Sequence, residues 1–129
     1  MQIFEKLITV STEDLDELNH VNNVRYIQWA NAIAKEHWDQ NTTKDIREKY
    51  FWVVLNHFIE YKSSALLDDI IKLKTYIRKT EGAKSTRVVE MYHAKTDKLI
   101  VKSETIWCLM NSKTLRPSRI TPELASLFD

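Results

Sequence analysis

Residues 14–26 read DLDELNHVNNVRY and join an expected first strand to the most apolar helical segment of the chain. This short stretch contains acidic, amide and imidazole side chains, more polar functional groups than a connecting loop requires. The apolar residues that follow predict a helix that would hold the loop in one position. We therefore interpret residues 14–26 as the entrance to a functional site, with Asp16 as its central residue.

A long and largely buried helix is expected to begin near Asn23. Asn22 is a suitable N-cap, because its side chain can accept a hydrogen bond from a free N–H group of the first turn. Apolar residues then recur at helical spacing as far as Trp38, and polar residues 39–42 end the pattern. Residues 3–10 favour a strand before the loop, and residues 44–50 predict a charged connector with room for one helical turn.

The pattern changes to period two after residue 50. The segments that favour strands are residues 51–61, 71–78, 84–94 and 99–109. Short turns join the last three of them, which indicates an antiparallel sheet. Residues 121–128 predict a short helix with Thr121 as N-cap and Pro122 at its first position. This order predicts an α+β fold in which one apolar helix packs on one face of a strongly bent antiparallel sheet.

Composition narrows the classes of function. A chain of 129 residues predicts one domain over residues 1–129. Its net charge of +1 gives no support for a nucleic-acid partner. The single cysteine, Cys108, excludes a disulfide framework and a cysteine-rich metal site, and the single glycine, Gly82, excludes Gly-rich nucleotide-binding loops. The sequence shows neither a membrane span nor the apolar core of a signal peptide, so we expect the cytoplasm.

Residues 16–26 resemble the acyl-CoA thioesterases of the 4-hydroxybenzoyl-CoA thioesterase type. The family pattern D-x-x-G-H-x-N-N-x-x-Y is matched at Asp16, His20, Asn22, Asn23 and Tyr26. The family's glycine is replaced by Asn19, a residue that tolerates a positive φ angle better than most. The resemblance implies a hotdog fold, in which a bent antiparallel sheet wraps a long central helix. It also implies a homodimer or homotetramer with the site between two subunits, which long edge strands independently favour.

The chemistry of such a site follows from these residue types. An aspartate is ionised at neutral pH, so Asp16 can attack a thioester carbonyl as a nucleophile or activate a water molecule as a general base. The resemblance and the position at a helix start make the backbone N–H of Asn23 the candidate catalytic donor to the carbonyl oxygen. His20 is a further catalytic candidate that orients the substrate, with loop packing as the alternative. Asn22 and Tyr26 are substrate-binding candidates, with helix capping and core packing as their alternatives.

The sequence therefore predicts an acyl-CoA thioesterase that hydrolyses an acyl thioester to the free acid and CoA. A thioester is already activated, so we expect no metal and no cofactor beyond the coenzyme A of the substrate. Acyl carrier protein is the alternative carrier, because plant-type acyl-carrier-protein thioesterases are similar across the same loop. A hotdog domain that binds an acyl ligand without turnover is a second alternative. A hydratase ranks last, because its differently placed acid–histidine motif is not found.

Other polar residues receive structural interpretations. We interpret Glu13 and Asp14 as solvated acids outside the site. His37, His57 and His93 have no metal-ligand spacing and are interpreted as packing or surface residues. The Lys and Arg residues of the strands are interpreted as mostly a solvated face, with a few available for the phosphates of coenzyme A.

Overall fold

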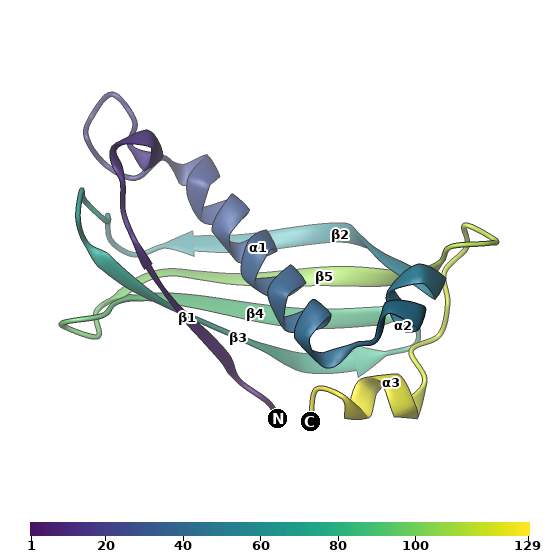
Figure 1. Cartoon of the computed structure of the whole chain (residues 1–129). Helices are drawn as coiled ribbons and strands as arrows, with labels where there is room; N and C mark the ends of the chain where they lie inside the picture. Colours follow the sequence, from purple (N-terminus) through teal and green to yellow (C-terminus); the bar gives the residue numbers. More distant parts are fainter.

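A five-stranded antiparallel sheet carries one long helix across its face (Figure 1). The computed structural model describes all residues, 1–129. The strands are β1 (Phe4–Thr9), β2 (Tyr50–Tyr61), β3 (Ile70–Glu81), β4 (Lys84–His93) and β5 (Leu99–Asn111). Their order in the sheet is β1-β3-β4-β5-β2, and every neighbouring pair is antiparallel. The predicted α+β class and the predicted hairpins are confirmed.

The long helix, α1 (Asn23–Asn41), begins and ends at capping side chains. The Oδ1 atom of Asn22 accepts the Val24 N–H at 3.0 Å, which confirms the predicted N-cap. At the other end, the Thr42 hydroxyl donates to the carbonyl oxygen of Trp38 at 2.7 Å. The 19 residues span roughly 28 Å, enough to cross the whole sheet. One stripe of α1 is buried, and it consists of Tyr26, Ala30, Ile33, Ala34 and His37.

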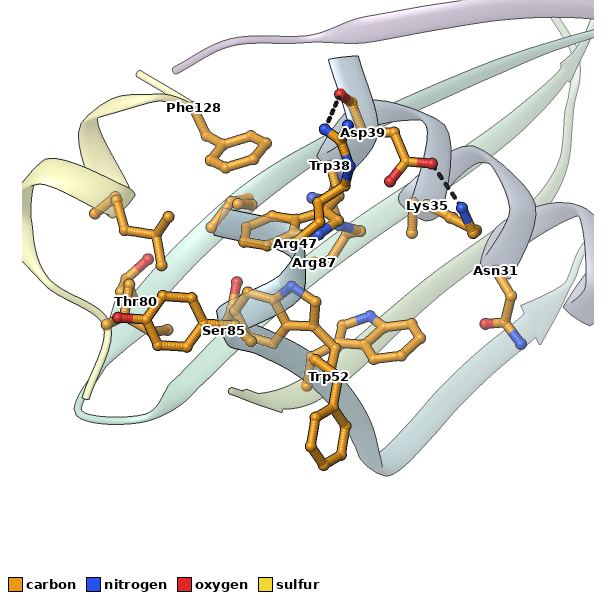
Figure 2. A pocket seen from close by; sticks show the side chains of 18 residues that line it. Asn31, Lys35, Trp38, Asp39, Arg47, Trp52, Thr80, Ser85, Arg87 and Phe128 are labelled. Atoms are coloured by element: carbon orange, nitrogen blue, oxygen red, sulfur yellow. Dashed lines mark hydrogen bonds and ion pairs between the residues drawn. The ribbon is translucent and has the colours of Figure 1, made fainter. Parts of the chain in front are cut away.

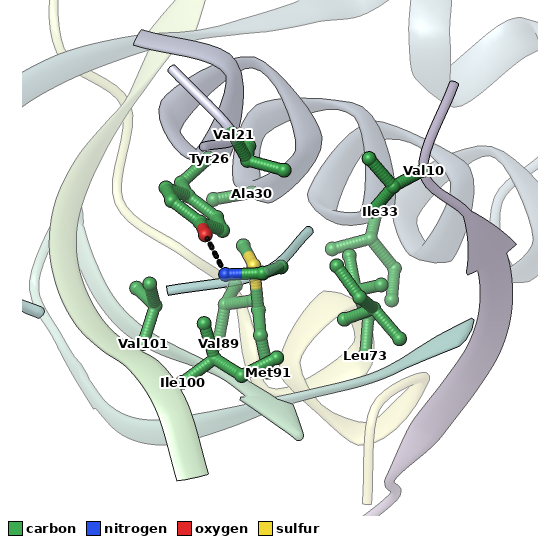
Figure 3. Close-up of a cluster of buried hydrophobic side chains, with 12 residues drawn as sticks. Val10, Val21, Tyr26, Ala30, Ile33, Leu73, Val89, Met91, Ile100 and Val101 are labelled. Carbon is green, nitrogen blue, oxygen red and sulfur yellow. Dashed lines mark hydrogen bonds between the residues drawn. The ribbon is translucent and has the colours of Figure 1, made fainter. Parts of the chain in front are cut away.

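The main core lies between this stripe and the inner face of the sheet (Figure 3). Strand register places Leu73 opposite Met91, and Met91 opposite Val101, so their side chains share one face. Ile33 of α1 packs above them, and Leu73 and Met91 are fully enclosed. Each such side chain contributes about 1.5–3 kcal/mol when it leaves water. This packing fixes α1, and with it the loop that enters α1.

Two short α-helices, and a 3₁₀ helix at Thr12–Asp14, complete the chain. Residues 44–50 were expected to be mainly a connector, but they contain α2 (Lys44–Lys49), whose N-cap Thr43 accepts the Ile46 N–H at 3.3 Å. Ile46 packs against a second, smaller core cluster, and this contact was hidden by the charged residues around it. The last helix, α3 (Pro122–Ser126), has Thr121 as its N-cap and confirms the prediction. None of the helices is both long and apolar enough to cross a membrane.

Two polar residues are buried among the apolar ones on the inner face. His37 of α1 is fully enclosed, and Arg87 of β4 is 7% exposed. Arg87 donates through Nη1 to His37 Nδ1 at 2.9 Å and to the Thr75 hydroxyl at 3.0 Å. The interpretation of His37 as a packing residue is confirmed. The interpretation of the strand arginines as a solvated face is wrong for Arg87.

Strand β2 forms one edge of the sheet and pairs only with β5. Its free side exposes large apolar side chains instead of the charges that usually protect an edge. Phe58 is 63% exposed and Leu55 is 49% exposed. A bulge between Val54 and Asn56 interrupts the register near the middle of the strand. Strand β1 at the opposite edge is half as long.

Candidate active site

The loop before α1 closes into a tight turn from Asp16 to His20. The Asp16 N–H donates to the His20 carbonyl oxygen at 2.8 Å, and the Asn19 N–H donates to the Asp16 carbonyl oxygen at 3.1 Å. Asn19 lies in the left-handed region with a φ angle of 61°. This is the position of the family's glycine, and asparagine is among the few other residues that occupy the region readily. The substitution therefore preserves the turn.

The Asp16 carboxylate has one anchored oxygen and one free oxygen. Its Oδ1 atom accepts the Leu18 N–H at 2.9 Å and the His20 N–H at 3.2 Å. Its Oδ2 atom has no hydrogen-bond partner in the protein. The turn thus fixes the direction of the side chain while leaving one oxygen available for chemistry.

The start of α1 leaves one backbone donor free near this carboxylate. The Val24 N–H is taken by the Asn22 side chain, and the Arg25 N–H donates to the Asn22 carbonyl oxygen at 2.8 Å. The Asn23 N–H has no partner within the helix, as expected for a first helical residue. A cavity of about 430 Å³ is lined by both Asp16 and Asn23, together with His20 and Tyr26. The fold therefore places the Asp16 carboxylate and the start of α1 at the same cavity.

The other predicted site residues have distinct surroundings. His20 is exposed and lines the cavity, and its side chain makes no hydrogen bond. Asn22 does not line the cavity, since its Oδ1 atom caps α1. Tyr26 is 2% exposed, and its hydroxyl oxygen accepts the Ala65 N–H at 3.0 Å. Burial raises the pKa of Tyr26 above its ordinary value, so the phenol stays protonated at neutral pH. Tyr26 belongs to both the core and the cavity wall.

Sequence reasoning missed the opposite wall of the cavity. The residues that form it come from the end of β2 and the segment after it: Tyr61, Lys62, Ser63 and Ser64. They reach the loop because the Val21 N–H donates to the Ala65 carbonyl oxygen at 3.0 Å. Ser63 is itself held by a hydrogen bond from its hydroxyl to the Leu99 carbonyl oxygen at 3.0 Å. The run of polar residues at a strand end was the only signal in the sequence.

The interpretation of Asp14 as a solvated acid is wrong, because its side chain is buried. It is 4% exposed and accepts the Arg25 Nε–H at 2.5 Å and the Ser11 N–H at 2.8 Å. Burial alone would raise the pKa of Asp14, but the hydrogen bonds from Ser11 and Arg25 outweigh burial and lower it below its ordinary value. The resulting ion pair ties the loop to the first turn of α1.

Solved structures of other proteins share this fold. A 1,4-dihydroxy-2-naphthoyl-CoA thioesterase from Synechocystis is 12% identical, with a TM-score of 0.85 over 98% of this chain and 95% of the other. A Staphylococcus aureus protein determined in complex with CoA is 18% identical, with a TM-score of 0.84 over 98% and 81%. The 12:0-ACP thioesterase from Umbellularia californica is 15% identical, with a TM-score of 0.84 over 98% and 51%. At these identities the likeness confirms the hotdog fold.

The sequence itself identifies the family. No curated protein sequence matches the chain significantly. The family model of the Thioesterase-like superfamily matches residues 10–128, which include the whole loop around Asp16. This match confirms the resemblance seen in residues 16–26 and supports hydrolysis of an acyl thioester as the class of activity. The chain belongs to the Thioesterase-like superfamily.

Proposed function

We propose that this protein is an acyl-CoA thioesterase in which Asp16 performs the chemistry and the Asn23 N–H stabilises the carbonyl oxygen. The observation that carries the proposal is the unpartnered Oδ2 atom of Asp16, in a cavity that it shares with the free N–H of a helix start. The two groups supply what acyl transfer needs: an electron-rich oxygen and a donor for the developing oxyanion.

Two routes use the same geometry. In the first, Oδ2 attacks the thioester carbon, the C–S bond breaks, and water then hydrolyses the mixed anhydride. In the second, Oδ2 takes a proton from a water molecule that attacks the same carbon. In both routes the thiolate leaves and takes up a proton, and the acid product carries one oxygen from water. The positive end of the α1 dipole favours the negative charge that forms on the carbonyl oxygen.

The remaining cavity residues have supporting roles in this proposal. His20 lines the same cavity as Asp16, its side chain makes no hydrogen bond, and it is suited to orient the thioester. Tyr26 provides a rigid wall, since the Ala65 N–H holds its hydroxyl in place. Asn22 supports the site indirectly, because its cap removes the Val24 N–H from the set of free donors and leaves that of Asn23.

The activity is tested by thiol release from short, medium, long and aromatic acyl-CoAs. Asp16→Asn keeps an oxygen to accept the Leu18 and His20 N–H groups but removes the charge. We expect kcat to fall by about 10²–10⁴-fold without loss of folding. Glu17→Gln is the matched control, because it removes a neighbouring carboxylate that does not line the cavity. Equal turnover by wild type and Asp16→Asn would contradict the mechanism.

Acyl carrier protein is the alternative carrier. Its support is the fold shared with the 12:0-ACP thioesterase from Umbellularia californica. The same panel of acyl groups on acyl carrier protein distinguishes the carriers, and we expect higher kcat/KM for the CoA thioesters. Absence of turnover on both carriers, with acyl ligands still bound, would identify a binding domain instead.

We also propose that the protein is a homodimer formed through β2. The exposed apolar side chains on this unpaired edge favour a second copy of the same strand, which would extend the sheet across a twofold axis. The end of β2 lines the Asp16 cavity at Tyr61, so such a partner would lie next to the site. This placement agrees with a site between two subunits.

A further inference from the structure

A second and more apolar cavity lies under the C-terminal half of α1 (Figure 2). Its volume is about 490 Å³, within the range of small-molecule sites. Aromatic and aliphatic side chains from α1, β2, β5, α3 and the segment after α3 form most of its walls, among them Trp38, Tyr50, Trp52, Trp107, Leu124 and Phe128. It shares no lining residue with the Asp16 cavity, and Ala34 lies roughly 16 Å along α1 from Asn23.

Arg87 also lines this cavity, and its buried charge has no acidic partner. No carboxylate forms an ion pair with it. Burial lowers the pKa of Arg87 to about 10, so the guanidinium is still charged at neutral pH. Its two protein partners, His37 and Thr75, are neutral, because burial and the Arg87 charge lower the pKa of His37 to about 4. A charged side chain that is this buried normally has a counter-ion.

The N–H groups of Arg87 that have no protein partner are the ones that can bind a carboxylate with two hydrogen bonds. Both protein hydrogen bonds come from Nη1, and no partner is found for Nε or Nη2. Neither atom is sealed from solvent, because Ser103 Oγ is the only fully enclosed side-chain N or O atom without a partner. Arg87 lines the cavity, and its Nε–H and Nη2–H groups are the donors that the protein leaves free for a ligand there. Together they form the planar fork that binds both oxygens of one carboxylate.

The charges at the rim add to this preference. Asp39 is the one acidic lining residue, and Lys35 neutralises its carboxylate at 2.6 Å. Arg47 contributes a further positive charge, and its Nη1 donates to the Asp39 carbonyl oxygen at 3.0 Å. The cavity therefore has an excess of positive charge around apolar walls. This combination suits a monoanion with an apolar body better than a neutral lipid or a strongly hydrated phosphate.

We propose that this cavity is a second ligand site, which binds a carboxylate with an aliphatic or aromatic body and pairs it with Nε and Nη2 of Arg87. The carboxylate is that of a free carboxylic acid, because this cavity shares no lining residue with the Asp16 cavity. The binding itself does not depend on the proposed thioesterase activity. It would supply the counter-ion that Arg87 lacks within the chain.

Tryptophan fluorescence can test the site directly, because three of the four tryptophans line it: Trp38, Trp52 and Trp107. The probes are octanoate and 3-phenylpropionate, each compared with its uncharged amide by titration. We expect each acid to bind at least about tenfold more tightly than its amide. Arg87→Met should abolish this preference, with folding checked by circular dichroism. Arg78→Met, on the exposed side of β3, should retain it.

A cavity-filling variant keeps the test valid if Arg87→Met does not fold. Ala125→Trp places bulk in the cavity from the short helix α3 and leaves Arg87 intact. We expect it to weaken both acid and amide by tenfold or more. Equal binding of acid and amide by the wild type, or an acid preference that survives in Arg87→Met, would overturn the proposal.

Discussion

Asn19 shows how one residue controls the direction of the side chain that we propose to be catalytic, Asp16. Its left-handed conformation lets the Leu18 and His20 N–H groups point at the same oxygen of Asp16. Asn19→Gly should keep turnover and stability, because glycine occupies this region without steric cost. Asn19→Val should lower the free energy of unfolding by about 1–2 kcal/mol and reduce kcat, because a β-branched residue cannot adopt this φ angle without strain. Urea unfolding and thiol release check both results; equal behaviour of the two variants would contradict this role.

The lowered pKa of His37 predicts that the stability of the protein depends on pH. Its pKa is about 4 in the folded protein and about 6.5 when unfolded, so the unfolded chain binds more protons between these values. Stability is therefore complete above pH 6.5 and is lost as the pH falls towards 4, by about 3 kcal/mol from this group. Urea unfolding at pH 7.5, 5.5 and 4.5 should show a flatter profile for His37→Gln than for wild type. Parallel profiles would show that His37 is not the titrating group.

At the scale of an element, the cap of α1 links stability to the site. Asn22→Ala should lower the free energy of unfolding by about 1 kcal/mol, because the Val24 N–H loses its acceptor. It should also lower kcat, since the freed first turn no longer holds the Asn23 N–H in one direction. Asn22→Asp is the matched control and should keep the cap. Urea unfolding and thiol release measure the two effects. An Asn22→Ala protein with the kcat of the wild type would show that the cap does not position the site.

Elements were predictable from the sequence where a periodic pattern and its flanking signals agreed. The period-two strands and the capped helix α1 meet this condition, and the structure confirms them. The helix α2 was underestimated, because only Ile46 among its six residues makes an apolar contact. Arg87 could not be recognised as buried, because a charged residue in an alternating strand has the same sequence pattern whether α1 or water covers it. The far wall of the Asp16 cavity depends on long-range pairing that no local pattern contains.

At the scale of the whole molecule, the free edge of strand β2 predicts the oligomeric state. Phe58→Lys should convert the proposed dimer into a monomer, because an inserted charge on the edge opposes pairing. Leu7→Lys is the matched control on the other edge strand, where Leu7 is 62% exposed. Light scattering after size-exclusion chromatography measures the mass. Thiol release should fall only in the monomeric variant. A wild type that is monomeric, or a Phe58→Lys protein that keeps its dimer mass, would remove the proposed interface.

The proposed pairing of two β2 edges also makes the stability of this protein depend on its concentration. A chain that buries Phe58 and Leu55 only against a second copy gains part of its stability by mass action. Its melting temperature then rises with the amount of protein in solution, and dilution to the nanomolar levels of a sensitive assay favours separated subunits. In the cell the same relation would join activity to abundance, so that doubling the amount of this protein more than doubles its turnover wherever its level is close to the dissociation constant.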